Sequence, residues 1–403
     1  MRPALYRDDD ELLYKEDYRQ ARQRIEAFCE GEVLDRVCLS VTAPRRGTHP
    51  PAAHSGDVPH RPAFQMVEVP EFPSNEVRHT DLEFILQFHH AWLTNTFWGG
   101  EALPMARNDL GFVSTGFPDV TFLPESPWGH PWLQRCSVDD YQFDPGNRWW
   151  RQTYDIHMAL LEDSQGKYFP GEPALIPPTD LLAGIRGPGD LCLDMIDDPD
   201  GVHEVLDHLT QVHRWRMERV YEAIAAEKSI PVGSPEGRDF TPSADFSRND
   251  SPEGRLLLPP WCHKFRIQCD FAALIGPDHL RELVLPELVY FAQYFERVEY
   301  HLDGRQNLAH LPAVLEIDEV NYVQWVPRPG DPQGLYWQDV WQAVRATGRG
   351  MQTSVPFDQV EQVLREWGPK GLWLTTTAPT EEAATDLLKH AETWSCQHPW
   401  DVR

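Results

Sequence analysis

Two short segments in the second half of the chain alternate strictly between apolar and polar residues. In 298–303, the apolar Val298, Tyr300 and Leu302 alternate with Glu299, His301 and Asp303. In 265–270, the apolar Phe265, Ile267 and Cys269 alternate with Arg266, Gln268 and Asp270. Successive side chains of a strand point to opposite sides, so each segment is predicted to be a strand with one core face and one polar face. Burying such charged faces costs free energy unless the charges pair with one another. The two segments are therefore predicted to be neighbouring strands whose polar faces line an active site.

The C-terminal half of the chain repeats strands and helices at a regular pitch. Apolar strands are predicted to end near Asp270, Asp303, Val326, Val355 and Ala378. Helices are predicted in the gaps between them, over 277–294, 307–315, 337–347 and 357–367. Strands separated by helices at this pitch indicate parallel pairing with right-handed crossovers.

The N-terminal half is less regular but adds further elements. Helices are predicted over 11–31, 81–95, 149–161 and 199–225, and strands over 37–41, 102–106 and 174–180, with a weak further strand near 229–233. Eight strands predict a single α/β domain over 1–403, a (β/α)₈ TIM-type barrel with an N-terminal helical extension (1–35) and an irregular loop (44–75). A doubly wound sheet is the alternative, but polar faces on adjacent strands suit a barrel lumen better.

Charge and cysteine content narrow the function. The formal net charge is −27, from 63 acidic and 36 basic residues, which opposes non-specific binding to nucleic acid or to an anionic membrane. The seven cysteines are odd in number and form no C-x-x-C pair, so neither a disulfide framework nor a zinc ribbon is indicated. With no apolar signal core and no apolar run long enough for a membrane span, we expect a cytoplasmic protein that acts on a small molecule.

The strand ends carry the candidate chemistry, because a TIM barrel places its active site there. Asp270, His301 and Asp303 are therefore the predicted catalytic residues. Two carboxylates and an imidazole facing one lumen perturb each other's protonation, and they can ligate a metal or move a proton. Arg266 and Glu299, one layer deeper, are expected to form a buried structural ion pair.

Other polar or aromatic residues near predicted strand ends are weaker candidates. The substrate-binding candidates are Glu101, Asn108, Asp180, Gln268, Trp325 and Gln352. Residues of these types more often cap helices, bond to loops or pack in a core. The aromatic helix segments 290–294 and 337–341 are expected either to cover the barrel or to form a homodimer interface.

The segment 265–304 and the motif Q-W-V-P at 324–327 resemble the uroporphyrinogen decarboxylase-like superfamily, especially a divergent branch with a similar Q-C-D-F, H-L-D-G and Q-W-V-P series. The resemblance runs through most of the chain and implies a (β/α)₈ barrel. One branch of the superfamily decarboxylates uroporphyrinogen without a cofactor. Another contains corrinoid-dependent methyltransferases, in which zinc activates a thiol and a separate protein carries the corrinoid.

The chain departs from both branches at known motifs. Where the methyltransferases carry H-x-C-G, His301 matches but Asp303 replaces the cysteine, and their late cysteine falls near Ala378. Carboxylate and imidazole ligands suit a harder metal than a thiolate pair does. The arginine-rich R-Q-A-G-R-Y motif of the decarboxylases is also missing, since the similar segment 19–22 precedes the first strand and lacks the glycine.

Several functions therefore remain open. The first is metal-assisted methyl transfer linked to a corrinoid protein, with a divalent metal, zinc or another, held by His301, Asp303 and Asp270. The second is metal-independent decarboxylation or lyase chemistry by the paired carboxylates, although true uroporphyrinogen decarboxylation is disfavoured by the acidic chain. A glycosidase, and a barrel that binds a ligand without turnover, are further alternatives.

Overall fold

A seven-stranded, mostly parallel sheet organises the part of the chain that the computed structural model describes, namely residues 12–47, 67–71, 73–107, 120–122, 131–133, 143–171, 175–227, 265–293, 295, 297–328 and 330–396. The strand order is β2-β1-β11-β10-β9-β8-β7, and only the β1–β2 pair is antiparallel. The strands are β1 (Cys38–Pro44), β2 (Thr96–Gly100), β7 (Phe265–Gln268), β8 (Val298–Asp303), β9 (Val320–Val326), β10 (Gly350–Ser354) and β11 (Leu372–Thr377).

Four short strands lie outside this sheet. β3 (Met105–Ala106) pairs in parallel with β6 (Phe169–Pro170), and β4 (Val120–Phe122) pairs antiparallel with β5 (Pro131–Leu133). Within the described residues the sheet does not close on itself, so the structure shows a mixed α/β fold with a mostly parallel sheet.

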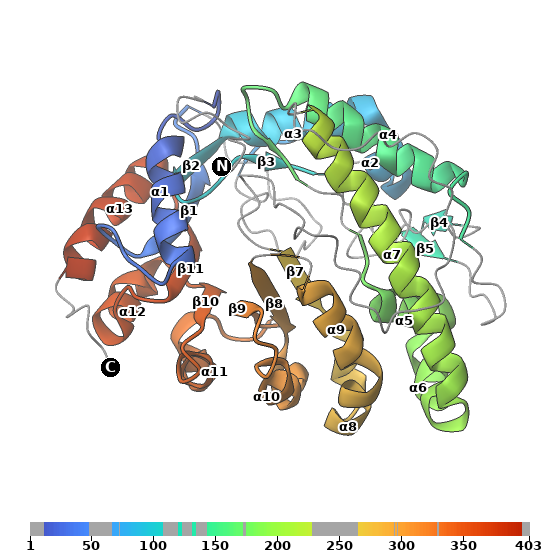
Figure 1. The fold of residues 1–403 in the computed structure, drawn as a ribbon. Coiled ribbons are helices and arrows are strands. Elements are labelled where there is room, and N and C mark those ends of the chain that lie inside the picture. The colour runs from blue at the N-terminus through green and yellow to red at the C-terminus, as the bar shows by residue number, and fades with distance from the viewer. Residues whose placement is uncertain are drawn as a thin grey trace.

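The C-terminal helices cover one side of the sheet (Figure 1). They are α8 (Pro277–His279), α9 (Leu285–Ala292), α10 (Leu311–Val314), α11 (Gln338–Arg345), α12 (Val360–Trp367) and α13 (Glu381–Cys396), with a π-helical turn over Leu280–Val284. Their apolar residues share one core with strand residues such as Leu39, Tyr300, Leu302 and Leu374, all of which are fully buried. We call this side of the sheet the outer face, and the side that carries His301 the inner face.

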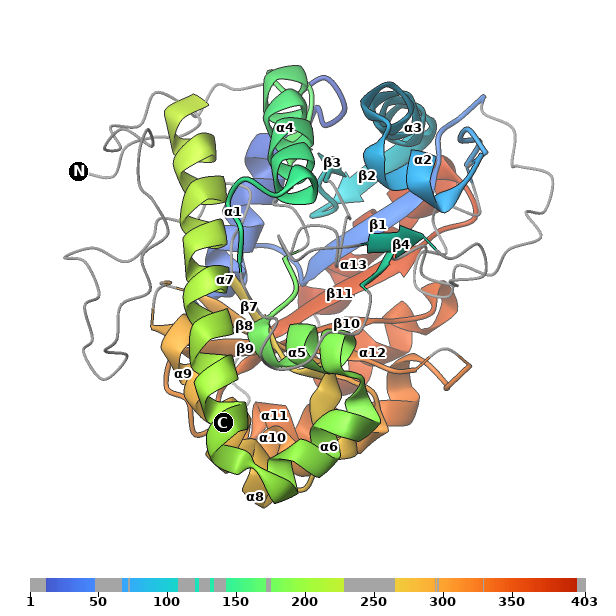
Figure 2. The same ribbon diagram turned by 90° about the vertical axis from the view of Figure 1, so that its right-hand side faces the viewer.

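Six further helices of the described residues lie between β1 and β7 in the sequence. They are α2 (Asn75–Thr80), α3 (Leu82–Asn95), α4 (Arg148–Asp163), α5 (Pro178–Arg186), α6 (Pro188–Asp197) and α7 (Pro199–Glu227). The long α7 passes in front of the sheet in Figure 2, and it packs against α4, α5 and α6. No helix in the described ranges is both long and apolar enough to cross a membrane.

Helix α1 (Tyr18–Cys29) closes the N-terminal end of the inner face. The Phe28 ring lies 5.5 Å from that of Tyr322 and 5.6 Å from that of Trp373, measured between centroids. Together with Ile25 and Cys38 these residues form a separate buried cluster. A Cβ at Gly350 would come within 3.1 Å of the Phe28 ring, so a glycine at this position allows the helix to approach β10 closely.

Most predicted elements are confirmed, but the strand predicted over 102–106 is reduced to Met105–Ala106, and the sheet strand before it is β2 (Thr96–Gly100). The five C-terminal strands end within two residues of the predicted positions, and the helices after them are present, together with α13, which the pattern missed. The predicted strand over 174–180 is wrong, because Pro178 begins α5 in the first-turn position that proline favours. The weak strand near 229–233 lies outside the described residues, as does most of the 44–75 loop.

The α1 contact generates a stability prediction. Replacing Phe28 with Ala removes a large buried ring from the end of the inner face, and we expect a loss of about 3–5 kcal/mol in the free energy of unfolding. Leu34→Ala is the control, because this side chain is 55% exposed. Denaturant unfolding of both variants would measure the difference; equal, small losses would show that Phe28 does not support the fold.

Candidate metal centre

Asp270, His301 and Asp303 converge at the C-terminal ends of β7 and β8. Each offers one ligand atom, and these three atoms lie within 4.8 Å of one another. The register explains the convergence, since Gln268 pairs with His301 and the next residues on the same face are Asp270 and Asp303. The structure thus brings together the three residues that the sequence predicts to share one site, and their role as ligands or catalysts stays a prediction.

His301 is oriented by a neighbouring strand. Its Nδ1 lies 2.6 Å from Oε1 of Gln324, its register partner on β9. An amide oxygen only accepts hydrogen bonds, so in this arrangement Nδ1 carries the proton and Nε2 the lone pair of the neutral ring. A histidine held in this way presents Nε2 as a ligand or base with a fixed direction.

The Asp270 carboxyl is surrounded by negative charge. Desolvation by the surrounding protein, followed by repulsion from Asp180 and Asp303, raises its pKa to about 8, while Arg266 acts in the opposite direction. Its side chain still touches solvent. The repulsion follows from the proximity of the carboxylates and does not depend on the degree of burial.

Asp180 joins the cluster from the N-terminus of α5. Its Oδ1 accepts the backbone N–H of Phe271 at 2.9 Å, and its Oδ2 lies 3.4 Å from the Gln268 amide nitrogen. The same nitrogen lies 3.4 Å from Oδ2 of Asp270. Burial raises the pKa of Asp180, against the effect of these hydrogen bonds. The structure thus places the two predicted substrate-binding residues Asp180 and Gln268 beside the triad. Asp180 comes from a helix and not from a strand end.

A further buried carboxyl, Glu287, was missed by the sequence reading. Its Oε2 accepts hydrogen bonds from the backbone N–H and the hydroxyl of Thr179, which precedes Asp180. Burial, followed by the charge of Asp180, raises the pKa of Glu287 to about 8. Its signal in the sequence is a single acidic residue within the apolar run 283–289, which a solvent-facing helix position explains equally well.

The predicted ion pair below the triad is present. Nε of Arg266 lies 3.0 Å from Oε1 of Glu299, and the two residues are register partners. The burial is uneven, because the Glu299 side chain is 0% exposed and that of Arg266 is 38% exposed. Arg266 therefore keeps access to water, and the carboxylate is the member that depends on its partner.

Glu101 and Trp325 do not belong to the site, and these two predictions are wrong. Glu101 is buried at the opposite end of β1, where it accepts hydrogen bonds from the Arg36 guanidinium and the backbone N–H of Leu39. Trp325 is 1% exposed and packs on the outer face, with its ring centroid 4.9 Å from that of Trp337.

The remaining sequence candidates divide differently. Gln352 lies on β10 beside Gln324, so it belongs to the inner face but two strands away from His301. Asn108 lies outside the described residues.

Trp337 and Trp341 are almost fully buried, so they cover the sheet and do not offer a dimer surface. Cys269 is buried on the outer face and its pKa is raised by burial, as expected of a packed thiol.

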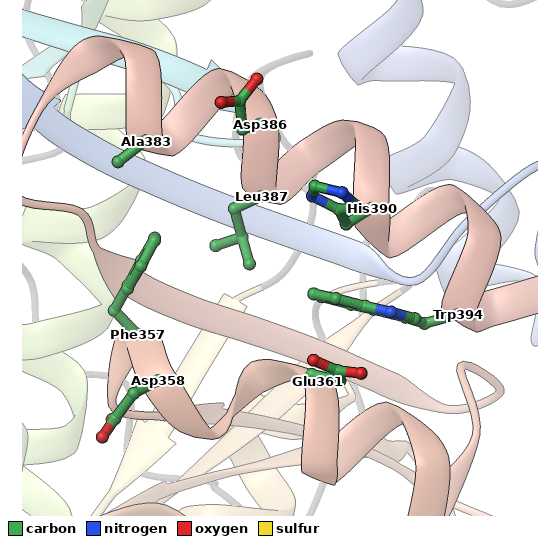
Figure 3. Close-up of a pocket in the computed structure, with 8 residues that line it drawn as sticks. All are labelled: Phe357, Asp358, Glu361, Ala383, Asp386, Leu387, His390 and Trp394. Carbon is green, nitrogen blue, oxygen red and sulfur yellow. The ribbon is translucent and has the colours of Figure 1, made fainter.

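A groove of about 280 Å³ lies elsewhere, between α12 and α13 (Figure 3). Phe357 and Leu387 point toward each other across it, and the rings of His390 and Trp394 are stacked at 5.5 Å. The groove belongs to the outer helix layer and shares no residue with the triad. The triad therefore remains the site with convergent chemistry.

Comparison with known proteins adds no assignment. No protein-family model matches the chain, and no curated protein matches it either.

Because Glu299 is fully buried and Arg266 is not, removing the arginine is expected to destabilise the fold more than removing the carboxylate. Arg266→Gln strands a buried carboxylate, so we expect it to cost about 2–4 kcal/mol of unfolding free energy. Glu299→Gln leaves an arginine that can turn to solvent, so we expect about 1 kcal/mol or less. Chemical denaturation of both variants at pH 7 would measure the two losses. A larger loss for Glu299→Gln would contradict the burial argument.

Glu287 predicts a pH dependence of stability. Because its pKa is about 8 in the fold and near 4.5 without it, its contribution to stability is complete below pH 4.5 and is lost as pH rises through 8. Glu287→Gln cannot ionise, so the melting temperature of this variant should fall less between pH 5 and pH 8 than that of the wild type. Parallel curves would show that the carboxyl does not titrate in this way. Glu316→Gln is the control, because this carboxyl is exposed in an ion pair with Arg281.

Proposed function

We propose that the chain is a divalent-cation-dependent enzyme acting on a small molecule, with the cation held by Asp270, His301 and Asp303. The observation that carries this proposal is the convergence of the three ligand atoms within 4.8 Å. Asp180 adds a third carboxylate beside them, and the nearby Arg266 is shared with Glu299. A bound cation offsets this accumulation of negative charge, and metal binding replaces the proton on a carboxyl whose pKa is raised.

The donor set supports a harder cation than thiolate-bound zinc. In the methyltransferase branch that the chain resembles, two cysteines hold zinc, and here Asp303 and Ala378 stand at those positions. Ala378 is fully buried, and the buried Cys269 thiol hydrogen-bonds to Asp180 and is not among the three converging ligand atoms. One imidazole and two carboxylates instead favour ions such as Mn²⁺, Fe²⁺ or a more weakly held Zn²⁺.

We propose also that the sheet continues into a (β/α)₈ barrel. The backbone N–H of Glu101 bonds to the carbonyl of Leu39, and the chain then enters β3, which pairs with β6. At the other edge, Asp180 bonds to the backbone just after β7. These contacts support a ring in which β3 and β6 lie between the edge strands β2 and β7, with the triad at the C-terminal end that barrel enzymes use.

Metal-assisted methyl transfer is the reaction that the resemblance favours, with the methyl group carried by a corrinoid on a partner protein. A bound cation would lower the pKa of the substrate heteroatom that takes part. Within this site, Gln324 would hold His301 in one orientation, and Gln268 would hold Asp270 and Asp180 together.

Metal-independent acid–base chemistry is the second candidate, and one observation favours it. With its pKa raised to about 8, Asp270 is largely protonated at pH 7 and can act as a general acid, while Asp180 and Asp303 provide carboxylates nearby. A decarboxylase or lyase would use such a set without a cation.

Elemental analysis of protein purified without chelators tests the first proposal against the second. We expect about one equivalent of a divalent transition metal in the wild type, and less than about a tenth in His301→Ala and in Asp303→Asn. His390→Ala is the matched control, because this exposed histidine lies on α13, away from the site. A wild type that remains empty after incubation with Zn²⁺, Mn²⁺ and Fe²⁺ would refute the metal centre and leave the acid–base proposal.

A further inference from the structure

The amide group of Gln324 on β9 has two ends, and only one of them is used by His301. Gln324 is the register partner of His301, so both side chains lie on the inner face. Oε1 of Gln324 lies 2.6 Å from Nδ1 of His301. An amide oxygen only accepts hydrogen bonds and an amide nitrogen only donates them. The contact with His301 therefore occupies the oxygen and leaves both hydrogens of the nitrogen for other acceptors.

The proposed metal centre fixes which way round this amide lies. A neutral histidine that binds a cation through Nε2 carries its proton on Nδ1, and this proton needs an acceptor such as Oε1 of Gln324. With the amide reversed, its nitrogen would donate to Nδ1 of His301. The histidine proton would then have to lie on Nε2, which could no longer bind a cation.

The amide nitrogen of Gln324 is open to a ligand. Across the described ranges, the contact with His301 is the hydrogen bond that the Gln324 side chain makes. Gln324 is half-buried, and its nitrogen is not among the buried polar atoms that lack a partner in this part of the chain. Because this nitrogen has no acceptor there and is not enclosed, it keeps contact with solvent.

A ligand at the triad would take the place of that solvent. Gln324 lies on the strand next to His301, and adjacent strands are about 4.8 Å apart, so a small molecule bound to the cation also covers the amide nitrogen. An N–H group that loses water without gaining an acceptor weakens binding. The position therefore selects ligands that place an acceptor oxygen beside the atom bound to the cation.

We propose that Gln324 is a substrate-binding residue and that the substrate carries a carbonyl group next to the atom that binds the cation. Nε2 of Gln324 donates to the carbonyl oxygen while Oε1 accepts the proton of His301 Nδ1. One amide thus recognises the substrate and orients a metal ligand. The inference deepens the proposed function by naming a feature of its substrate, and it rests on that function because the cation fixes the orientation of the amide.

The test uses Co²⁺-loaded protein and two neutral thiols, because binding of a thiolate to Co²⁺ produces an absorption band that can be titrated. Mercaptoacetamide carries a carbonyl group next to the carbon that bears the thiol, and isobutyl thiol has the same branched shape without it. We expect the wild type to bind mercaptoacetamide about tenfold more tightly than isobutyl thiol. The ratio of the two dissociation constants cancels any effect of a substitution on the cation itself.

Two substitutions of Gln324 separate its two contacts. Gln324→Glu keeps an oxygen for His301 but has no N–H group, so we expect it to take up Co²⁺ and to show a preference of less than about twofold. Gln324→Met removes both contacts, so we expect it to lose the preference and also to bind Co²⁺ about tenfold more weakly. Gln342→Glu is the matched control and should keep the wild-type ratio, because Gln342 is exposed on α11 in the outer helix layer.

The outcomes separate this inference from the metal proposal. A wild type that binds Co²⁺ without preferring mercaptoacetamide refutes the role of Gln324 and leaves the metal centre intact. A preference that survives in Gln324→Glu would also overturn it, because the cation or another group would then bind the carbonyl oxygen. A wild type that takes up no Co²⁺ refutes the metal centre, and the orientation of the amide with it. Gln324→Glu decides the question by itself if Gln324→Met fails to fold.

Discussion

The parallel register between β7 and β8 is the constraint on which the candidate site depends. It sets Arg266 beside Glu299 and Gln268 beside His301, so each polar residue faces a polar residue of the neighbouring strand. A shift of one residue would place the charged side chains of one strand against the apolar core of the outer face. The buried Glu299 carboxylate penalises such a shift strongly, because only the aligned register gives it Arg266. The ion pair therefore helps to fix the register of β7 and β8 below the candidate site.

Above this layer, carboxylates accumulate in a way that favours function over stability. Asp180, Asp270 and Asp303 repel one another, and Glu287 adds a buried carboxyl behind Asp180. Sites that retain unfavourable like-charge contacts are frequently functional, because evolution readily removes such contacts where they serve no purpose. Two hydrogen bonds from the backbone offset part of this repulsion: the N–H of Phe271 donates to Asp180, and the N–H of Thr179 donates to Glu287.

Strand alternation made the triad predictable, while residues that enter from helices were harder to place. His301 and Asp303 follow from a period of two along one strand, a purely local signal. Asp180 was named, but its place on α5 depends on Pro178, which starts a helix where the apolar run suggested a strand. Glu101 shows the opposite error, because its proximity to two glycines resembles a ligand loop, whereas its partner Arg36 lies 65 residues earlier in the chain. Tertiary partners of this kind leave no mark in local periodicity.

Helix α1 has a consequence for how the chain is made. Its buried partners Tyr322 and Trp373, and the strand β11 that pairs with β1, are encoded near the end of the sequence. At roughly 5–20 residues per second, the ribosome delivers them tens of seconds after α1 has emerged. Throughout that interval Phe28 lacks its two aromatic partners and β1 lacks β11, although β2 already pairs with the other edge of β1. Contacts so distant in sequence form slowly, so we expect closure of this end of the inner face to be a late step in folding.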